Sequence, residues 1–231
     1  LVHFASLTHQ GLTGADDFVK AYREDPKTDF HQKVADIANI PRKVAKTCNL
    51  GIMYGMGVTR LAEQLDVAPE EAKRLMKAYH EDVPFVKELS EAVQRKVAHR
   101  DKGGAVRSLL GRKCRFDLWE PNLFVSARAL PKEEALLEYG DNIKRSYLYR
   151  SLNKLIQSSG ADQTKAAMAK IFEELGKTPL VQVHDELAFS VADEAEARDL
   201  CKIMEEAVDL EVPTPCEISL GENWGDLTAV D

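Results

Sequence analysis

Apolar side chains recur every three or four residues along most of the chain, which is the pattern of amphipathic helices. Thr28 and Asp29 precede one such run and would cap a helix that carries His31. Gly176 follows another run and suits a helix C-terminus. The pattern predicts helices over residues 14–22, 28–37, 41–55 and 58–65, from residue 69 onward, and over residues 84–100, 131–140, 141–160, 161–175 and 193–210.

Other stretches predict strands. Residues 106–116 form two short strands around Gly111, and residues 216–220 form a final strand. Residues 180–191 place apolar and β-branched side chains on both sides of a polar His-Asp-Glu centre, which predicts a tight hairpin. Helices with a small, late antiparallel sheet place the chain in the α+β class.

The most informative polar pattern begins after Pro41, which fits the first position of a helix. Arg42, Lys46, Leu50 and Tyr54 follow at four-residue intervals, so on a helix they form one slowly drifting stripe. The basic residues would crowd the helix N-terminus, where the helix dipole disfavours cations. A phosphate bound there offsets this conflict, so the stripe predicts a nucleotide-binding face.

The composition is that of an ordinary soluble globular protein, with 231 residues, 44% of them hydrophobic and 30% charged. No apolar run is long enough to span a membrane, and no signal peptide is visible. The four cysteines are scattered and form no CxxC pair, so neither zinc nor a disulfide framework is suggested. Reduced thiols in the cytoplasm are the simplest interpretation.

Charge is segregated along the chain. The net charge of −7 argues weakly against a DNA partner, but residues 94–115 contain a single acid, Asp101. The basic residues of this strip are Arg95, Lys96, Arg100, Lys102, Arg107, Arg112, Lys113 and Arg115. A local basic strip can bind phosphates on an acidic protein. For Arg95 and Lys96 a solvated helix face is the alternative.

Two carboxylates, Asp185 and Glu186, lie at the tip of the predicted hairpin. Mg²⁺ usually takes one or two protein carboxylates together with substrate phosphates, so this pair is enough to hold it. An ordinary polar turn is the alternative, and the pair taken alone favours that interpretation.

Four motifs taken together change that interpretation. Residues 42–55, reading RKVAKTCNLGIMYG, are followed much later by VHDE at residues 183–186. Between and after them stand SLLGRK at residues 108–113 and GENW at residues 221–224. In order and spacing these motifs resemble the polymerase domain of the DNA polymerase I family, and the resemblance covers nearly the whole chain.

The resemblance implies template-directed DNA synthesis, in which two Mg²⁺ ions assist nucleotidyl transfer from a dNTP to a primer 3′-hydroxyl. Asp185 matches the family's metal ligand, Glu186 matches the acid beside it, and Lys46 would protonate the leaving pyrophosphate. The implied dNTP-binding residues are Arg42, Lys46, Leu50, Tyr54 and His31. The implied DNA-binding residues are Asn153, Gln157, His184, Arg107, Arg112 and Lys113.

Several of these residues have plainer alternatives. His31 could be the surface histidine of a capped helix, and His184 a strand residue satisfied by the backbone. Tyr54 could be a core aromatic at helical spacing. Asn153 and Gln157 could be solvated polar residues on a helix.

Three features depart from the family's pattern. Leu50 stands where an aromatic residue is usual and cannot stack on a nucleotide, which puts sugar discrimination, speed and fidelity in doubt. Tyr149 stands where an arginine is common, and Arg150 is one place away. The first palm motif, with the other metal-binding aspartate, is absent, and residues 1–5 resemble what directly follows it.

We therefore expect an incomplete polymerase domain with mostly helical fingers and a small antiparallel palm sheet. Residues 1–30 would begin the palm-to-fingers connection, residues 31–105 would form the fingers, and residues 106–231 the distal palm with the catalytic hairpin. Residues 116–121 and 161–165 are similar to the phage branch. The expected partners are primer–template DNA, dNTPs and a missing N-terminal polymerase segment, without which the chain would be inactive. The alternative is a non-catalytic module or subunit that binds primer–template DNA.

Overall fold

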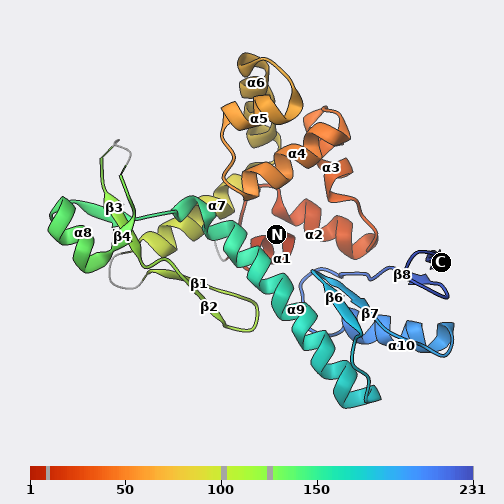
Figure 1. Ribbon diagram of the computed structural model, residues 1–231. Coiled ribbons are helices and arrows are strands. Elements are labelled where there is room, and N and C mark those ends of the chain that lie inside the picture. Colours follow the sequence, from red (N-terminus) through yellow and green to blue (C-terminus); the bar gives the residue numbers. More distant parts are fainter. Residues whose placement is uncertain (9–10, 100–102, 124–126, 231) are drawn as a thin grey trace.

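The computed structural model describes residues 1–8, 11–99, 103–123 and 127–230 (Figure 1). Helices form the N-terminal part, and short strand pairs separate the later helices. The helices before the first strand are α1 (Val2–Ser6), α2 (Ala15–Glu24), α3 (Phe30–Ala38), α4 (Arg42–Met53), α5 (Val58–Leu65), α6 (Pro69–Asp82) and α7 (Pro84–Ala98). The later helices are α8 (Lys132–Tyr139), the 3₁₀ turn η1 (Leu148–Arg150), α9 (Ser151–Leu175) and α10 (Glu194–Glu205). No helix among the described residues is long and apolar enough to cross a membrane.

Within the described part of the chain, every strand pairs with antiparallel neighbours in small sheets. One sheet has three strands, with β3 between β4 and β5. The other described strands form two-stranded sheets, in which β1 pairs with β2, β6 with β7 and β8 with β9. The strands are β1 (Ala105–Arg107), β2 (Lys113–Arg115), β3 (Leu118–Pro121), β4 (Leu130–Pro131), β5 (Ile143–Arg145), β6 (Val181–Val183), β7 (Glu186–Ala188), β8 (Ile218–Leu220) and β9 (Thr228–Val230). The predicted α+β class is confirmed.

The main core lies where the N-terminal helices meet α7 and α9. Phe18 of α2 packs against Phe30 and Phe85, with ring centroids 5.2 and 5.1 Å away. Leu152 and Leu155 bring the first turns of α9 into the same cluster. Aromatic side chains bury large apolar areas, so these contacts stabilise the junction of the helical half with the long helix α9.

The helix that carries the predicted stripe differs slightly from the sequence-based bounds. Pro41 is the N-cap residue of α4 and not its first helical residue, and its carbonyl accepts the Ala45 N–H at 3.0 Å. The helix ends at Met53, but the N–H of Tyr54 still bonds to the Leu50 carbonyl at 3.1 Å. Gly55 follows with a φ of +71°. The stripe therefore keeps its helical register to its last member.

The predicted helix over residues 141–160 is wrong in its first half. Strand β5 forms there and pairs with β3, and α9 begins only at Ser151. The Arg145 guanidinium stacks 4.5 Å from the centroid of the buried Trp119 ring, which favours the strand. From Ser151, α9 runs without a break through the second predicted helix and ends at Gly176, whose φ is +65°.

Candidate functional site

The stripe of α4 faces a cavity of about 970 Å³ that lies between α4, the start of α5 and the start of α9. Lys46, Leu50 and Tyr54 line it from the α4 side, and Asn153 lines it from α9. Leu50 and Tyr54 keep 40% and 54% of their surface exposed, so Tyr54 is not a core aromatic. The volume matches the larger ligand pockets of proteins. The structure thus brings three predicted nucleotide-binding residues together with one predicted DNA-binding residue.

A hydrogen bond connects the end of the stripe to α9. The side-chain amide of Gln157 donates to the Tyr54 hydroxyl at 3.2 Å. Gln157 lies one turn beyond Asn153 on α9, so both amides are on the side of α9 that faces α4. Gln157 is therefore more than a solvated polar residue in this structure, because it positions Tyr54.

Two residues that were not predicted as site residues, Tyr149 and Arg150, also line the cavity. The Arg150 guanidinium lies 4.7 Å from the Tyr147 ring centroid and 5.3 Å from that of Tyr149. The Tyr149 ring packs against Gly55, where an added Cβ would come within 2.5 Å of it. The sequence offered two signals: Tyr149 and Arg150 depart from the family's pattern, and a glycine after a helix often adopts positive φ and admits a close neighbour.

Arg42 is held by an acid from the preceding helix. Its Nε and Nη2 donate to Asp29 Oδ2 at 2.8 and 2.5 Å. The other oxygen of Asp29 caps α3 by accepting the N–H groups of His31 and Gln32. Burial opposes the charge of Asp29, but the Arg42 and backbone hydrogen bonds hold its pKa below the usual value. Asp29 thus offsets part of the unfavourable interaction between the basic residues and the helix dipole at the start of α4.

His31 belongs to a second hydrogen-bond chain that reaches the core. The buried Tyr79 hydroxyl donates to Asn49 Oδ1 at 2.6 Å, and Asn49 Nδ2 lies 2.8 Å from His31 Nδ1. Because the amide oxygen is already an acceptor, the amide nitrogen must donate to His31. The neutral His31 ring therefore carries its hydrogen on Nε2. Burial lowers the pKa of His31, and the charges of Arg42 and Lys46 lower it further against the opposing charge of Asp29.

The structure places His31 away from the larger cavity. It lines a separate cavity of about 320 Å³ with Tyr22, Phe30, Asn49 and Met53 among its neighbours. Arg42 and Lys46 nevertheless act on the His31 pKa, so the three groups lie within electrostatic reach of one another.

The predicted hairpin is present as β6 and β7, with His184 and Asp185 as its two-residue loop. His184 has a φ of +56°, as the first loop residue of a primed turn requires. Asp185 and Glu186 are both exposed. In Figure 1 the hairpin lies well apart from α4, and no hydrogen bond or ion pair between described residues joins the two. The structure does not bring Asp185 to the cavity of Lys46.

The loop between β1 and β2 is anchored on α9. Arg112 forms an ion pair with the buried Asp162 at 2.7 Å and donates to the Ser158 carbonyl at 2.9 Å. Burial opposes ionisation of Asp162, yet the Leu110 N–H and Arg112 hold its pKa below the usual value. Arg107 donates to the Gly111 carbonyl within the same loop.

Arg107, Arg112 and Lys113 of the predicted phosphate-binding group are all exposed. Arg100, Asp101 and Lys102 of the basic strip lie outside the described residues.

Comparison with known proteins places these features in a family context. A family model described as DNA polymerase family A matches residues 10–226. A DNA-directed DNA polymerase of Pseudomonas phage M6 is 32% identical, over 97% of this chain and 36% of its own length. A thermostable DNA polymerase I of Thermus aquaticus is 29% identical, over 92% of this chain and 25% of its own length.

The chain is also similar to a solved structure of a DNA polymerase domain. The POL domain of Pol1 from M. smegmatis, in complex with DNA primer-template and dNTP, matches with a TM-score of 0.65 and 26% identity. The match covers 92% of this chain and 36% of that one. This chain therefore spans between a quarter and little more than a third of the length of these relatives.

Proposed function

The chain belongs to DNA polymerase family A, and on that premise we propose that it takes part in template-directed DNA synthesis. It acts as part of a longer or split polymerase, in which Mg²⁺-dependent nucleotidyl transfer joins a dNTP to a primer 3′-hydroxyl. The observation that carries the proposal is the cavity in which Lys46, Leu50 and Tyr54 of α4 lie opposite Asn153 of α9.

In this proposal the cavity receives the dNTP. Lys46 is a compact, exposed cation beside it and binds the triphosphate, after which it protonates the leaving pyrophosphate. Arg42, already oriented by Asp29, adds a second positive charge. His31, which lines the separate smaller cavity, would offer its Nε2–H to the triphosphate. Tyr54, positioned by Gln157, lies near the templating base.

Asp185 is the proposed protein ligand for two Mg²⁺ ions, with Glu186 as the acid beside it. The pair fits the ion because both residues offer exposed oxygen atoms from a rigid hairpin. Magnesium completes its shell with water and phosphate oxygens, so few protein ligands suffice. When bound, the ions would neutralise phosphate charge during transfer.

The remaining residues hold primer–template DNA. Asn153 and Gln157 read minor-groove acceptors that all correct base pairs share, and His184 lies near the primer terminus. Arg107, Arg112 and Lys113 contact duplex phosphates, which position the DNA without reading its sequence. The complex of the mycobacterial relative supports primer–template DNA and dNTPs as partners. Residues 31–105 form the fingers, residues 106–231 the distal palm, and residues 1–30 the connection between palm and fingers.

Primer extension by a full-length family A polymerase that contains this chain tests the proposal. Asp185→Ala should lower the extension rate by at least about 100-fold, because it removes the charge that positions the metal. Asp199→Ala, on the exposed face of α10, is the matched control and should leave the rate unchanged. Undiminished extension by Asp185→Ala would show that the catalytic assignment is wrong.

A non-catalytic DNA-binding module is the second candidate function. The observation that favours it is that neither Asp185 nor Glu186 lines the cavity of Lys46. Tight primer–template binding, combined with no synthesis in any full-length context, would establish this alternative.

A further inference from the structure

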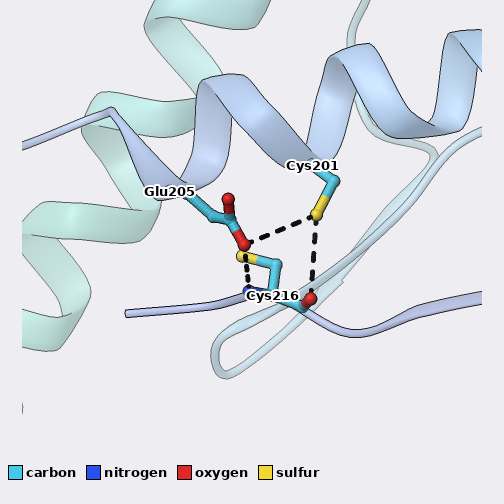
Figure 2. A group of neighbouring side chains, drawn as sticks. All are labelled: Cys201, Glu205 and Cys216. Atoms are coloured by element: carbon cyan, nitrogen blue, oxygen red, sulfur yellow. Dashed lines mark hydrogen bonds between the residues drawn. The ribbon is translucent and has the colours of Figure 1, made fainter. Parts of the chain in front are cut away.

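Two of the scattered cysteines come together on the C-terminal side of the molecule (Figure 2). Cys201 and Glu205 lie one turn apart on α10, and Cys216 precedes β8. The two sulfur atoms and a carboxylate oxygen all lie within 4.8 Å of one another. None of the three residues lines either cavity described above. The spacing of the cysteines along the sequence did not predict this cluster, because Cys201 and Cys216 belong to different elements.

The cluster is already oriented by hydrogen bonds. Glu205 Oε1 accepts the Cys216 N–H at 2.7 Å, and Cys201 Sγ lies 4.0 Å from the same oxygen and 3.8 Å from the Cys216 carbonyl. All three residues are partly buried, so solvent still reaches the cluster. The backbone donor holds the carboxylate against the thiols, which is the kind of supporting contact that orients metal ligands.

A cation would relieve the repulsion that ionisation of the two thiols creates. Burial, together with the neighbouring Cys201 and Glu205, raises the pKa of the Cys216 thiol to about 12. Burial and Glu205 also raise the pKa of Cys201. Two thiolates beside a carboxylate repel one another, whereas a divalent cation between them would neutralise most of that charge.

We propose that Cys201, Glu205 and Cys216 form a binding site for a thiophilic divalent cation of the Zn²⁺ class. Thiolate and carboxylate ligands together select such an ion over Mg²⁺, which takes oxygen ligands alone. Binding releases two thiol protons to solvent and changes no oxidation state. Water supplies the fourth ligand, and the ion ties α10 to the segment that leads into β8.

The geometry requires only a small adjustment. Zn–S and Zn–O bonds of about 2.3 and 2.1 Å place these tetrahedral ligand atoms about 3.6–3.8 Å apart. The donor atoms now lie within 4.8 Å, so a contraction of up to about 1.2 Å, through side-chain rotation, is enough.

Titration with Co²⁺ under reducing, oxygen-free conditions tests the site, because thiolate ligands give Co²⁺ an intense charge-transfer band that oxygen ligands do not. The complete chain should bind one Co²⁺ with this band, and Zn²⁺ but not excess Mg²⁺ should displace it. Cys201→Ser and Cys216→Ser should each weaken binding by at least about 10-fold. Glu205→Gln keeps the shape of the side chain and should weaken binding while retaining the band. Cys114→Ser, which removes a partly buried cysteine of β2, is the matched control and should behave as the parent chain.

Two results would overturn the proposal. One is the absence of a charge-transfer band at saturating Co²⁺, or a band that survives the double Cys201→Ser, Cys216→Ser substitution. The other is a Cys201–Cys216 disulfide found by peptide mapping after air oxidation, combined with no metal uptake by the reduced chain. The readout does not involve DNA, so it is independent of the proposed polymerase function.

Discussion

Asn49 Nδ2 lies 2.8 Å from His31 Nδ1, and this contact joins α3 to α4. The Tyr79 hydroxyl of α6 donates to the same Asn49 side chain. The buried Asn49 amide therefore satisfies hydrogen-bonding groups of both α3 and α6. A buried polar group without a partner costs far more than a satisfied one gains. The arrangement therefore determines both the packing of these helices and the tautomer of His31.

Tyr79→Phe should lower the free energy of unfolding by about 1–3 kcal/mol, because it leaves the buried Asn49 Oδ1 without a donor. Chemical denaturation followed by circular dichroism measures the change. Tyr139→Phe is the matched control, since its hydroxyl bonds to the Arg128 carbonyl at the surface, and it should cost less than about 0.5 kcal/mol. Equal losses of unfolding free energy in the two variants would contradict a structural role for the Tyr79–Asn49 hydrogen bond.

The chain should lose stability as the pH falls below the ordinary histidine value of 6.5, because burial lowers the pKa of His31 in the folded state. The folded chain then binds a proton less readily than the unfolded chain. The stability linked to His31 is fully present above about pH 6.5 and is lost as the pH falls through the lower folded pKa. His3 and His80, whose pKa values burial also lowers, act in the same direction.

Unfolding free energies measured between about pH 7 and pH 5 check this dependence. His31→Gln should make the loss of stability with falling pH shallower, because it removes one of the three histidines, among those the structure describes, whose pKa burial lowers. A slope identical to that of the parent chain would show that His31 does not contribute.

Gly55→Ala should destabilise the chain by about 1–2 kcal/mol, because alanine is strained at positive φ and its Cβ would meet the Tyr149 ring. Gly57→Ser is the matched control, because that site has a φ of −89°, open space for a Cβ and an N-cap position that accepts serine about as well as glycine. It should change stability by less than about 0.5 kcal/mol. Thermal unfolding of both variants measures the difference, and similar stabilities would mean that Tyr149 does not restrict this turn.

Leu50→Phe should lower the KM for dNTP by roughly 2- to 10-fold in a full-length polymerase, because an aromatic contact adds about 0.5–1.5 kcal/mol. Steady-state primer extension measures KM. Ile37→Phe introduces the same ring at another exposed site, on α3, and should leave KM unchanged. An unchanged KM for Leu50→Phe would place the nucleotide away from α4.

Much of the fold and of the candidate site was predictable because it depends on neighbours in sequence. The cap at Asp29 and the C-terminal glycine of α9 follow from local backbone preferences. The hairpin at His184 and Asp185 follows from the apolar and β-branched residues on both sides of a short polar segment. The stripe from Lys46 to Tyr54 followed from helical periodicity, and the cavity lined by these residues confirms that they share one face.

The sequence by itself determined the family, the α+β class and the four-residue spacing of the stripe, because periodicity and motif order are local properties of the chain. Only the tertiary structure decided that β5 is a strand, that Asp29 holds Arg42 and that Asp162 holds Arg112. It also brought Cys201 together with Cys216. Each of these results needs two segments to pack side by side, and the free energy of such a contact depends on burial and geometry that no single stretch of sequence contains.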